Sequence, residues 1–139
     1  MPVSSASRPW LLWLLGAVAV GFGLITLRSG GLVLFGPAEA RMAAGDYVPF
    51  VLWFNFLAGF AYIASGIGLF LRQRWGVALA LAIAITTAMA YAALGLHIAA
   101  DGAYEARTVG AMAVRLAVWV GIFLVGRRTI GCRARRRNG

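Results

Sequence analysis

One arginine lies inside an otherwise uncharged apolar stretch of this chain. Arg115 falls within the stretch from Val109 to Val125, about seven residues and therefore about 10 Å from its start if the stretch is helical. An arginine at mid-membrane is unfavourable by about 2.5 to 3.5 kcal/mol or more, so its head must face protein, water or an acidic partner. Two roles are open for Arg115: a structural salt bridge that locks this helix to the preceding loop, or the binding of an anionic or carbonyl-bearing ligand.

The acids closest to Arg115 in sequence precede it. Helical side chains tilt toward the N-terminus of their own helix, so the guanidinium is expected to point toward Glu105 and Asp101. This direction predicts an ion pair between Arg115 and one of the two carboxylates. Trp119 lies one turn further along the helix, where a guanidinium over its ring would gain cation–π stabilisation.

Other side chains are expected to reach the same half of the membrane from neighbouring helices. Asn55 lies near the start of the second apolar stretch and His97 closes the third. Each also has a simpler role, an interhelical hydrogen bond for Asn55 and an ordinary interfacial position for His97. The complete set of candidate ligand-binding residues is Arg115, His97, Asn55, Tyr62, Tyr91 and Trp119.

Donors for a metal site are few. If the third helix continued beyond the membrane surface, His97, Asp101 and Glu105 would share one face at i, i+4 spacing, although Gly102 favours an earlier end. A zinc or copper site needs three or four convergent donors, so no metal site is predicted. One histidine excludes bis-histidine haem ligation, and Cys132 has no second cysteine for thiol chemistry. Without a nucleophile and base, paired carboxylates or a phosphate loop, the chain is not expected to be an enzyme on its own.

The elements that must position these residues are membrane-spanning helices. Of the 139 residues, 62% are hydrophobic and 12% are charged, whereas about a quarter of the residues in a soluble domain are charged. About 20 apolar residues span a bilayer core of about 30 Å. The sequence therefore predicts one all-α transmembrane domain over residues 1–139, with spans at residues 10–27, 50–71, 75–98 and 109–125.

The distribution of charge predicts how these spans are oriented. The connections on one side hold all four acids, Glu39, Asp46, Asp101 and Glu105. The other side holds arginines and no acid: Arg8, Arg72, Arg74, Arg127, Arg128, Arg133, Arg135, Arg136 and Arg137. The positive-inside bias then predicts that both termini are cytoplasmic, in a multi-pass protein of the cell inner membrane. We expect the first span to be retained as an anchor, because it exceeds the h-region of about 7 to 15 residues in a cleaved signal peptide.

The first acidic connection is not uniformly polar. Gly31 to Gly36 reads GLVLFG, which either extends the first helix or lies in the membrane interface. Ala38 to Ala44 has helix-forming composition and predicts a short interfacial helix. Pro49 suits the start of the second span.

Small residues are expected to carry the contacts between helices, because helices in lipid gain little from burying apolar surface against one another. The short basic turn after residue 71 makes its neighbours antiparallel, which predicts an up-and-down four-helix bundle. The expected contact residues are Ala17, Gly21, Ala19 and Gly23 in the first span, Asn55, Gly59, Tyr62, Gly66, Ala64 and Gly68 in the second, and Ala80, Ala84, Ala88 and Ala92 in the third.

The C-terminal tail, residues 127–139, is strongly basic. Its six arginines predict attraction to anionic lipid, worth about 1 kcal/mol per residue near the surface. The net charge of +9 does not predict nucleic-acid binding, because the charge lies beside a membrane and no recognition fold accompanies it. Besides lipid, the expected partners are another membrane protein or a second copy of the chain.

The run from Ala58 to Ile98, AGFAYIASGIGLFLRQRWGVALALAIAITTAMAYAALGLHI, resembles the middle of DoxX-like bacterial membrane proteins. In that family a glycine-rich second helix ends in a short basic turn, and an alanine-rich third helix ends near a histidine. The opening LGAVAVGFGLITL from Leu15 is loosely similar. The resemblance implies a four-helix inner-membrane protein associated with quinone-linked oxidation or a redox-protective complex. It does not extend over the segment from His97 to Trp119.

Three functions are consistent with these patterns. The first is an accessory protein or subunit of a membrane redox system, in which a quinone is the only cofactor expected and binds in a polar pocket of the outer leaflet. The second is a transporter of a small solute or ion that works as an oligomer, although no acidic residue lies within a span to couple protons. The third is a scaffold without a ligand that binds another membrane protein.

Overall fold

All regular structure in the described part of the chain is α-helical. The computed structural model describes the backbone of residues 8–137 and the side chains of residues 8–131. Its helices are α1 (Pro9–Phe35), α2 (Ala38–Ala44), α3 (Pro49–Phe70), α4 (Arg74–Ala99) and α5 (Ala106–Arg137). All but α2 are long and apolar enough to cross a membrane, α5 through its segment Ala106–Gly131. The prediction of an all-α chain with four helices long and apolar enough to span a membrane is confirmed.

Proline and the apolar pattern set the helix starts. Pro9 and Pro49 occupy the first helical positions of α1 and α3, where a missing N–H leaves no helical hydrogen bond unmade. The predicted short helix at Ala38–Ala44 is confirmed. GLVLFG extends the first helix, since α1 continues to Phe35 and leaves Arg28 exposed on its surface. The basic tail is helical as far as Arg137, while the rest of it lies outside the described residues.

Two helices end on a non-glycine residue in the left-handed conformation. Arg72 ends α3 with φ 56°, and Asp101 follows α4 with φ 59°. Each end is closed by a backbone bond that spans five residues, from Gln73 N–H to Gly68 O and from Gly102 N–H to His97 O, both 2.9 Å, which is the Schellman pattern. Because α4 ends at Ala99, the helical stack of His97, Asp101 and Glu105 is not formed.

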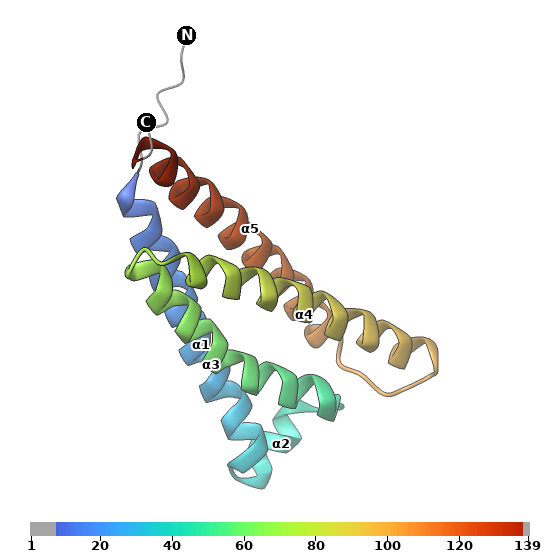
Figure 1. Ribbon diagram of the computed structural model, residues 1–139. Helices are drawn as coiled ribbons and strands as arrows, with labels where there is room; N and C mark the ends of the chain where they lie inside the picture. Colours follow the sequence, from blue (N-terminus) through green and yellow to red (C-terminus); the bar gives the residue numbers. More distant parts are fainter. Residues whose placement is uncertain (1–7, 138–139) are drawn as a thin grey trace.

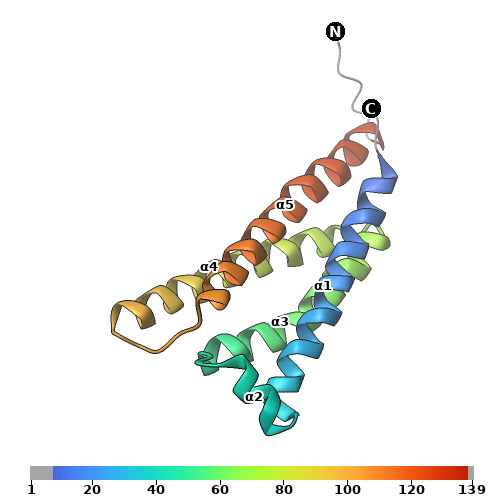
Figure 2. The same ribbon diagram turned by 180° about the vertical axis from the view of Figure 1, so that it is seen from behind.

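Each long helix packs against its neighbours in the chain. α1 lies along α3, α3 crosses α4, and α4 lies along α5, whereas α1 and α5 touch over a short stretch only. Figures 1 and 2 show that the start of α1 and the end of α5 lie close together and that the two helices diverge toward the end that holds α2. The four spans therefore form an open wedge rather than a closed bundle.

Glycines bring α1 and α3 into backbone contact. A Cβ on Gly23 would lie 2.8 Å from the Gly59 carbonyl oxygen, and one on Gly66 would lie 2.9 Å from the Gly16 oxygen. These glycines are seven residues apart on each helix, so they share one face. The expected face of Gly59 and Gly66 is thus buried, whereas Gly21, expected to pack, faces open space.

Glycines also allow close backbone contact where α3 crosses α4. A Cβ on Gly68 would lie 2.7 Å from the Gly76 Cα, and the Ser65 hydroxyl donates to the Gly76 carbonyl oxygen at 2.9 Å. Beyond the crossing the helices separate, so the alanine stripe of α4 is buried at Ala80 and Ala84 and exposed at Ala88 and Ala92. The expectation that this stripe packs along its whole length was wrong, because α4 leaves α3 halfway.

Candidate functional site

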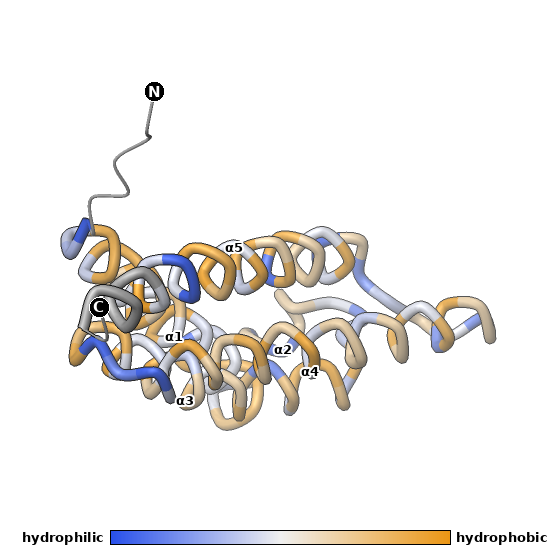
Figure 3. Tube along the Cα trace, turned by 45° about the horizontal axis from the view of Figure 1, so that its top comes forward, coloured by the Kyte–Doolittle hydropathy of each residue, from blue (hydrophilic) through white to orange (hydrophobic). Residues whose placement is uncertain are grey.

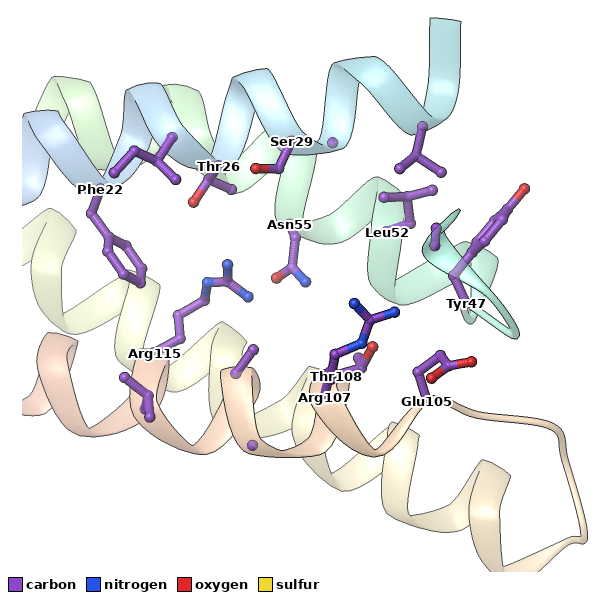
Figure 4. Close-up of a pocket in the computed structure, with 17 residues that line it drawn as sticks. Phe22, Thr26, Ser29, Tyr47, Leu52, Asn55, Glu105, Arg107, Thr108 and Arg115 are labelled. Atoms are coloured by element: carbon purple, nitrogen blue, oxygen red, sulfur yellow. The ribbon is translucent and has the colours of Figure 1, made fainter. Parts of the chain in front are cut away.

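The divergence of α1 and α5 leaves a cavity of about 540 Å³ between them. We call it the α1–α5 cavity. It lies toward the end of the molecule that holds α2 and the four acids (Figure 4). Its lining comes from α1 (Phe22, Ile25, Thr26, Ser29, Gly30, Val33), the end of α2 (Ala44), the connection before α3 (Tyr47), α3 (Leu52, Asn55), and α5 with the residue before it (Glu105, Arg107, Thr108, Gly110, Ala111, Val114, Arg115).

Two hydrogen bonds join the acidic connection to the start of α5 beside the cavity. The Glu105 carboxylate accepts the backbone N–H of Asp46 at 2.9 Å. Arg107 donates to the carbonyl oxygen of Ala43 at 3.2 Å. These bonds hold the segment around Tyr47 against the start of α5, where Tyr47 lines the cavity.

Arg115 enters the cavity from α5 and is half-buried. Its guanidinium carbon lies 5.5 Å from the centre of the Phe22 ring, which is cation–π range. One terminal nitrogen donates to the Met112 sulfur at 3.6 Å, a weak bond, and the Nε is buried without a partner. Among the described residues, the weak bond to Met112 is the one hydrogen bond that the Arg115 side chain makes, and Figure 4 shows its guanidinium pointing into the cavity.

Asn55 faces Arg115 from α3. Figure 4 shows its amide group close to the guanidinium at the inner end of the cavity. The Asn55 Oδ1 atom is buried without a hydrogen-bond partner, and a buried amide left unpaired is destabilising by roughly 1 to 3 kcal/mol. Asn55 and Arg115 both line the α1–α5 cavity, and their binding of a ligand stays a prediction.

Three hydroxyl-bearing side chains were not predicted. Thr26 and Ser29 come from α1 and Thr108 comes from the first turn of α5. Thr26 and Ser29 lie four and seven residues after Phe22, so these three share one helix face. That spacing was the available signal. Ser29 lies beyond residue 27, where the predicted first span ends, and Thr26 lies within that span, where a threonine is an ordinary packing residue.

The aromatic partner of Arg115 is Phe22, not Trp119 as predicted. Trp119 is fully buried and stacks on Tyr62, with ring centres 4.7 Å apart. Tyr62 in turn lies 5.8 Å from Phe22. Trp119 and Tyr62 therefore lie in the core below the cavity and support Phe22 rather than line the cavity. Their polar atoms, Tyr62 Oη and Trp119 Nε1, are buried without partners.

The expected ion pair of Arg115 with Glu105 or Asp101 is absent. No arginine pairs with a carboxylate among the side chains of residues 8–131, and Glu105 is bound instead to the Asp46 backbone. The reason is directional: Arg115 points across the bundle toward α1 and α3 instead of along α5. Asp101 lies in the turn after α4 and is exposed.

His97 and Tyr91 lie away from the cavity. The His97 ring lies 3.0 Å from the carbonyl oxygen of Ala103 through Nε2 and makes an edge contact with Phe50. A Cβ on Gly102 would collide with this ring, so the turn after α4 closes over His97. Tyr91 packs on a separate apolar cluster around Leu94 and Met112. Neither residue joins Arg115 in this structure.

Four helices long and apolar enough to cross a membrane are typical of a multi-pass membrane protein, and Arg115 lines a cavity between two of them. No group of three or more potential metal ligands occurs among the described residues. No protein-family model, no curated protein and no solved structure matches the chain. The resemblance to DoxX-like proteins stays a prediction, so the function is argued from the cavity itself.

Proposed function

We propose that this protein binds a membrane-soluble quinone in the α1–α5 cavity and acts as an accessory protein or subunit of a membrane redox system. One observation carries the proposal: Arg115 and Asn55 converge on the inner end of the cavity with hydrogen-bonding groups that no protein atom satisfies. Polar groups buried this way are normally paired. A quinone carbonyl oxygen would accept a hydrogen bond from the Arg115 guanidinium, and the hydroxyl of the reduced quinol would donate one to Asn55 Oδ1.

The chemistry of the lining matches a quinone head group. A carbonyl oxygen accepts hydrogen bonds from guanidinium N–H groups and from hydroxyls such as those of Thr26 and Thr108. The Phe22 ring, which lines the cavity beside Arg115, gives a flat ring an aromatic edge to pack against. A volume of about 540 Å³ falls within the range of about 300 to 1,000 Å³ typical of small-molecule sites.

The position of the cavity also suits a lipid-soluble ligand. Its walls on α1 and α5 carry Ile25, Val33 and Val114, and both helices are apolar enough to lie in a membrane. The gap between them gives an isoprenoid tail a route to the bilayer. The resemblance to DoxX-like proteins supports the choice of a redox-linked amphiphile over other amphiphiles.

Quinone binding by the purified protein tests this proposal. A short-chain ubiquinone analogue is titrated into protein in mild detergent, and quenching of tryptophan fluorescence reports binding. Arg115→Gln removes a charge-assisted hydrogen bond worth about 1.5 to 3 kcal/mol, so we expect the Kd to rise about 10- to 100-fold. Asn55→Leu is expected to weaken binding as well.

Arg28→Gln is the matched control, because Arg28 lies on α1, is exposed and does not line the cavity. Its Kd is expected to equal that of the unmodified protein. Absence of saturable quinone binding to well-folded protein would contradict the proposal and favour a scaffold without a ligand. Uptake of a solute by proteoliposomes would favour the transporter instead.

A further inference from the structure

The end of the molecule opposite the acids contains a second, smaller cavity. It measures about 190 Å³ and lies between the first turn of α4 and the last described side chains of α5. Its lining is Arg74, Val77, Arg127, Ile130 and Gly131. We call it the α4–α5 cavity. Figure 3 shows that hydrophilic segments of the chain gather at this end, next to the apolar length of the helices.

The α4–α5 cavity combines two cations with an apolar floor. Arg74 and Arg127 are both exposed at its rim and come from different helices. No acid competes for them, because Glu39, Asp46, Asp101 and Glu105 all lie at the other end. Val77 and Ile130 line its deeper part, and Val77 packs on Gly126, where α5 has no side chain.

The start of α4 adds to the positive potential. α4 begins at Arg74 with no side-chain cap, so N–H groups of its first turn have no capping side chain. Unpaired N–H groups at a helix start carry a partial positive charge that favours an anion. Here they lie beside two arginines, at the level where exposed Trp75 marks the membrane interface.

We propose that the α4–α5 cavity binds the phosphate group of an anionic phospholipid, held between Arg74 and Arg127, with the glycerol and the start of an acyl chain on Val77 and Ile130. This site is independent of the quinone site and lies in the opposite leaflet. It differs from general attraction by the basic tail, because it depends on two particular arginines of two helices and on an apolar floor that a free anion would not use.

The test compares variants that remove equal charge at different places. Arg74→Gln and Arg127→Gln alter the cavity, while Arg72→Asn and Arg128→Gln remove one charge each from residues of the same end that do not line it. Asparagine is chosen at position 72 because it tolerates the positive φ found there. Binding of phosphatidylglycerol to purified protein is measured by native mass spectrometry, with phosphatidylcholine as the neutral lipid.

We expect each cavity variant to weaken phosphatidylglycerol binding about fivefold, equivalent to about 1 kcal/mol, and each control to leave it unchanged. Equal losses in all four variants would overturn the proposal in favour of delocalised surface attraction. Competition by inorganic phosphate at the lipid's own affinity would overturn it in favour of a free-anion site. The thermal stability of each variant in detergent distinguishes loss of the site from loss of the fold. Arg74→Lys and Arg127→Lys keep the charge, so each should bind phosphatidylglycerol more tightly than the glutamine variant at the same position.

Discussion

At the scale of single residues, the unusual feature is a half-buried arginine that has no carboxylate partner in the described part of the chain. Arg115 is held by a weak bond to Met112 and by the Phe22 ring. Neither compensates fully for removing a guanidinium from water, which is unfavourable by about 2.5 to 3.5 kcal/mol or more at mid-membrane. An arginine kept under these conditions is more easily explained by a ligand than by a contribution to stability.

A double-mutant cycle of Arg115 and Glu105 tests this view of the arginine. Glu105 is engaged by the Asp46 backbone, so Arg115→Gln and Glu105→Gln should change the free energy of unfolding independently. We expect a coupling energy below about 0.5 kcal/mol, the usual limit for residues that do not interact. The measurement is unfolding by SDS in mixed micelles. A coupling energy above about 1 kcal/mol would contradict this expectation and support the salt bridge predicted from the sequence.

The sequence predicted part of this site. Arg115 and Asn55 were found because a charge and an amide are conspicuous within apolar spans. Phe22 was not, because phenylalanine is ordinary in a membrane helix and its contact with Arg115 depends on how α1 faces α5. His97 was placed in the site wrongly, because the left-handed turn at Asp101 folds the following loop back over it.

At the scale of elements, the helices pack through faces that carry glycine, and the sequence predicted only some of the glycines in these contacts. The lengths of the spans follow from apolar composition, and Pro49 marks a start. Which glycines pack depends on the rotation of each helix about its axis, and several small-residue spacings in the sequence were compatible with packing. The structure selects Gly16 and Gly23 on α1 and leaves Gly21 free. The spans were predicted to end close to where α3 and α4 end, but the left-handed conformation of Arg72 and Asp101 could not be predicted, because non-glycine residues rarely adopt positive φ.

The pair Gly23→Ala and Gly21→Ala tests the α1–α3 contact with one chemical change at two places. A Cβ on Gly23 would lie 2.7 Å from Ile63 and 2.8 Å from the Gly59 oxygen, whereas one on Gly21 would meet nothing within 4 Å. Gly23→Ala should therefore destabilise the protein by about 1 to 3 kcal/mol, as overpacking does. Gly21→Ala should not lower stability. The same SDS unfolding experiment measures both variants. Equal changes in stability would mean that α1 presents a different face to α3 than it does in the structure.

At the scale of the whole molecule, charge and shape divide the protein into two ends. The start of α1, the end of α5 and the α3–α4 turn lie toward the arginine-rich end, and α2 with the α4–α5 connection lies toward the acidic end (Figure 1). The helices meet closely at the first end and spread at the second, so the larger cavity opens at the acidic end. If the arginine-rich end is cytoplasmic, as the positive-inside bias predicts, a ligand in this cavity exchanges with the outer leaflet.

Thiol labelling tests that orientation. In a Cys132→Ser background, Glu39→Cys places a thiol on exposed α2 and Gln73→Cys places one in the exposed α3–α4 turn. A membrane-impermeant maleimide should label Glu39→Cys in right-side-out vesicles and Gln73→Cys only in inverted ones, because a maleimide that cannot cross the bilayer reports the side on which each thiol lies. The reverse pattern would place the α1–α5 cavity in the cytoplasmic leaflet and the α4–α5 cavity in the outer one. Each proposed site would then lie in the other leaflet, although the contacts proposed within it would be unchanged.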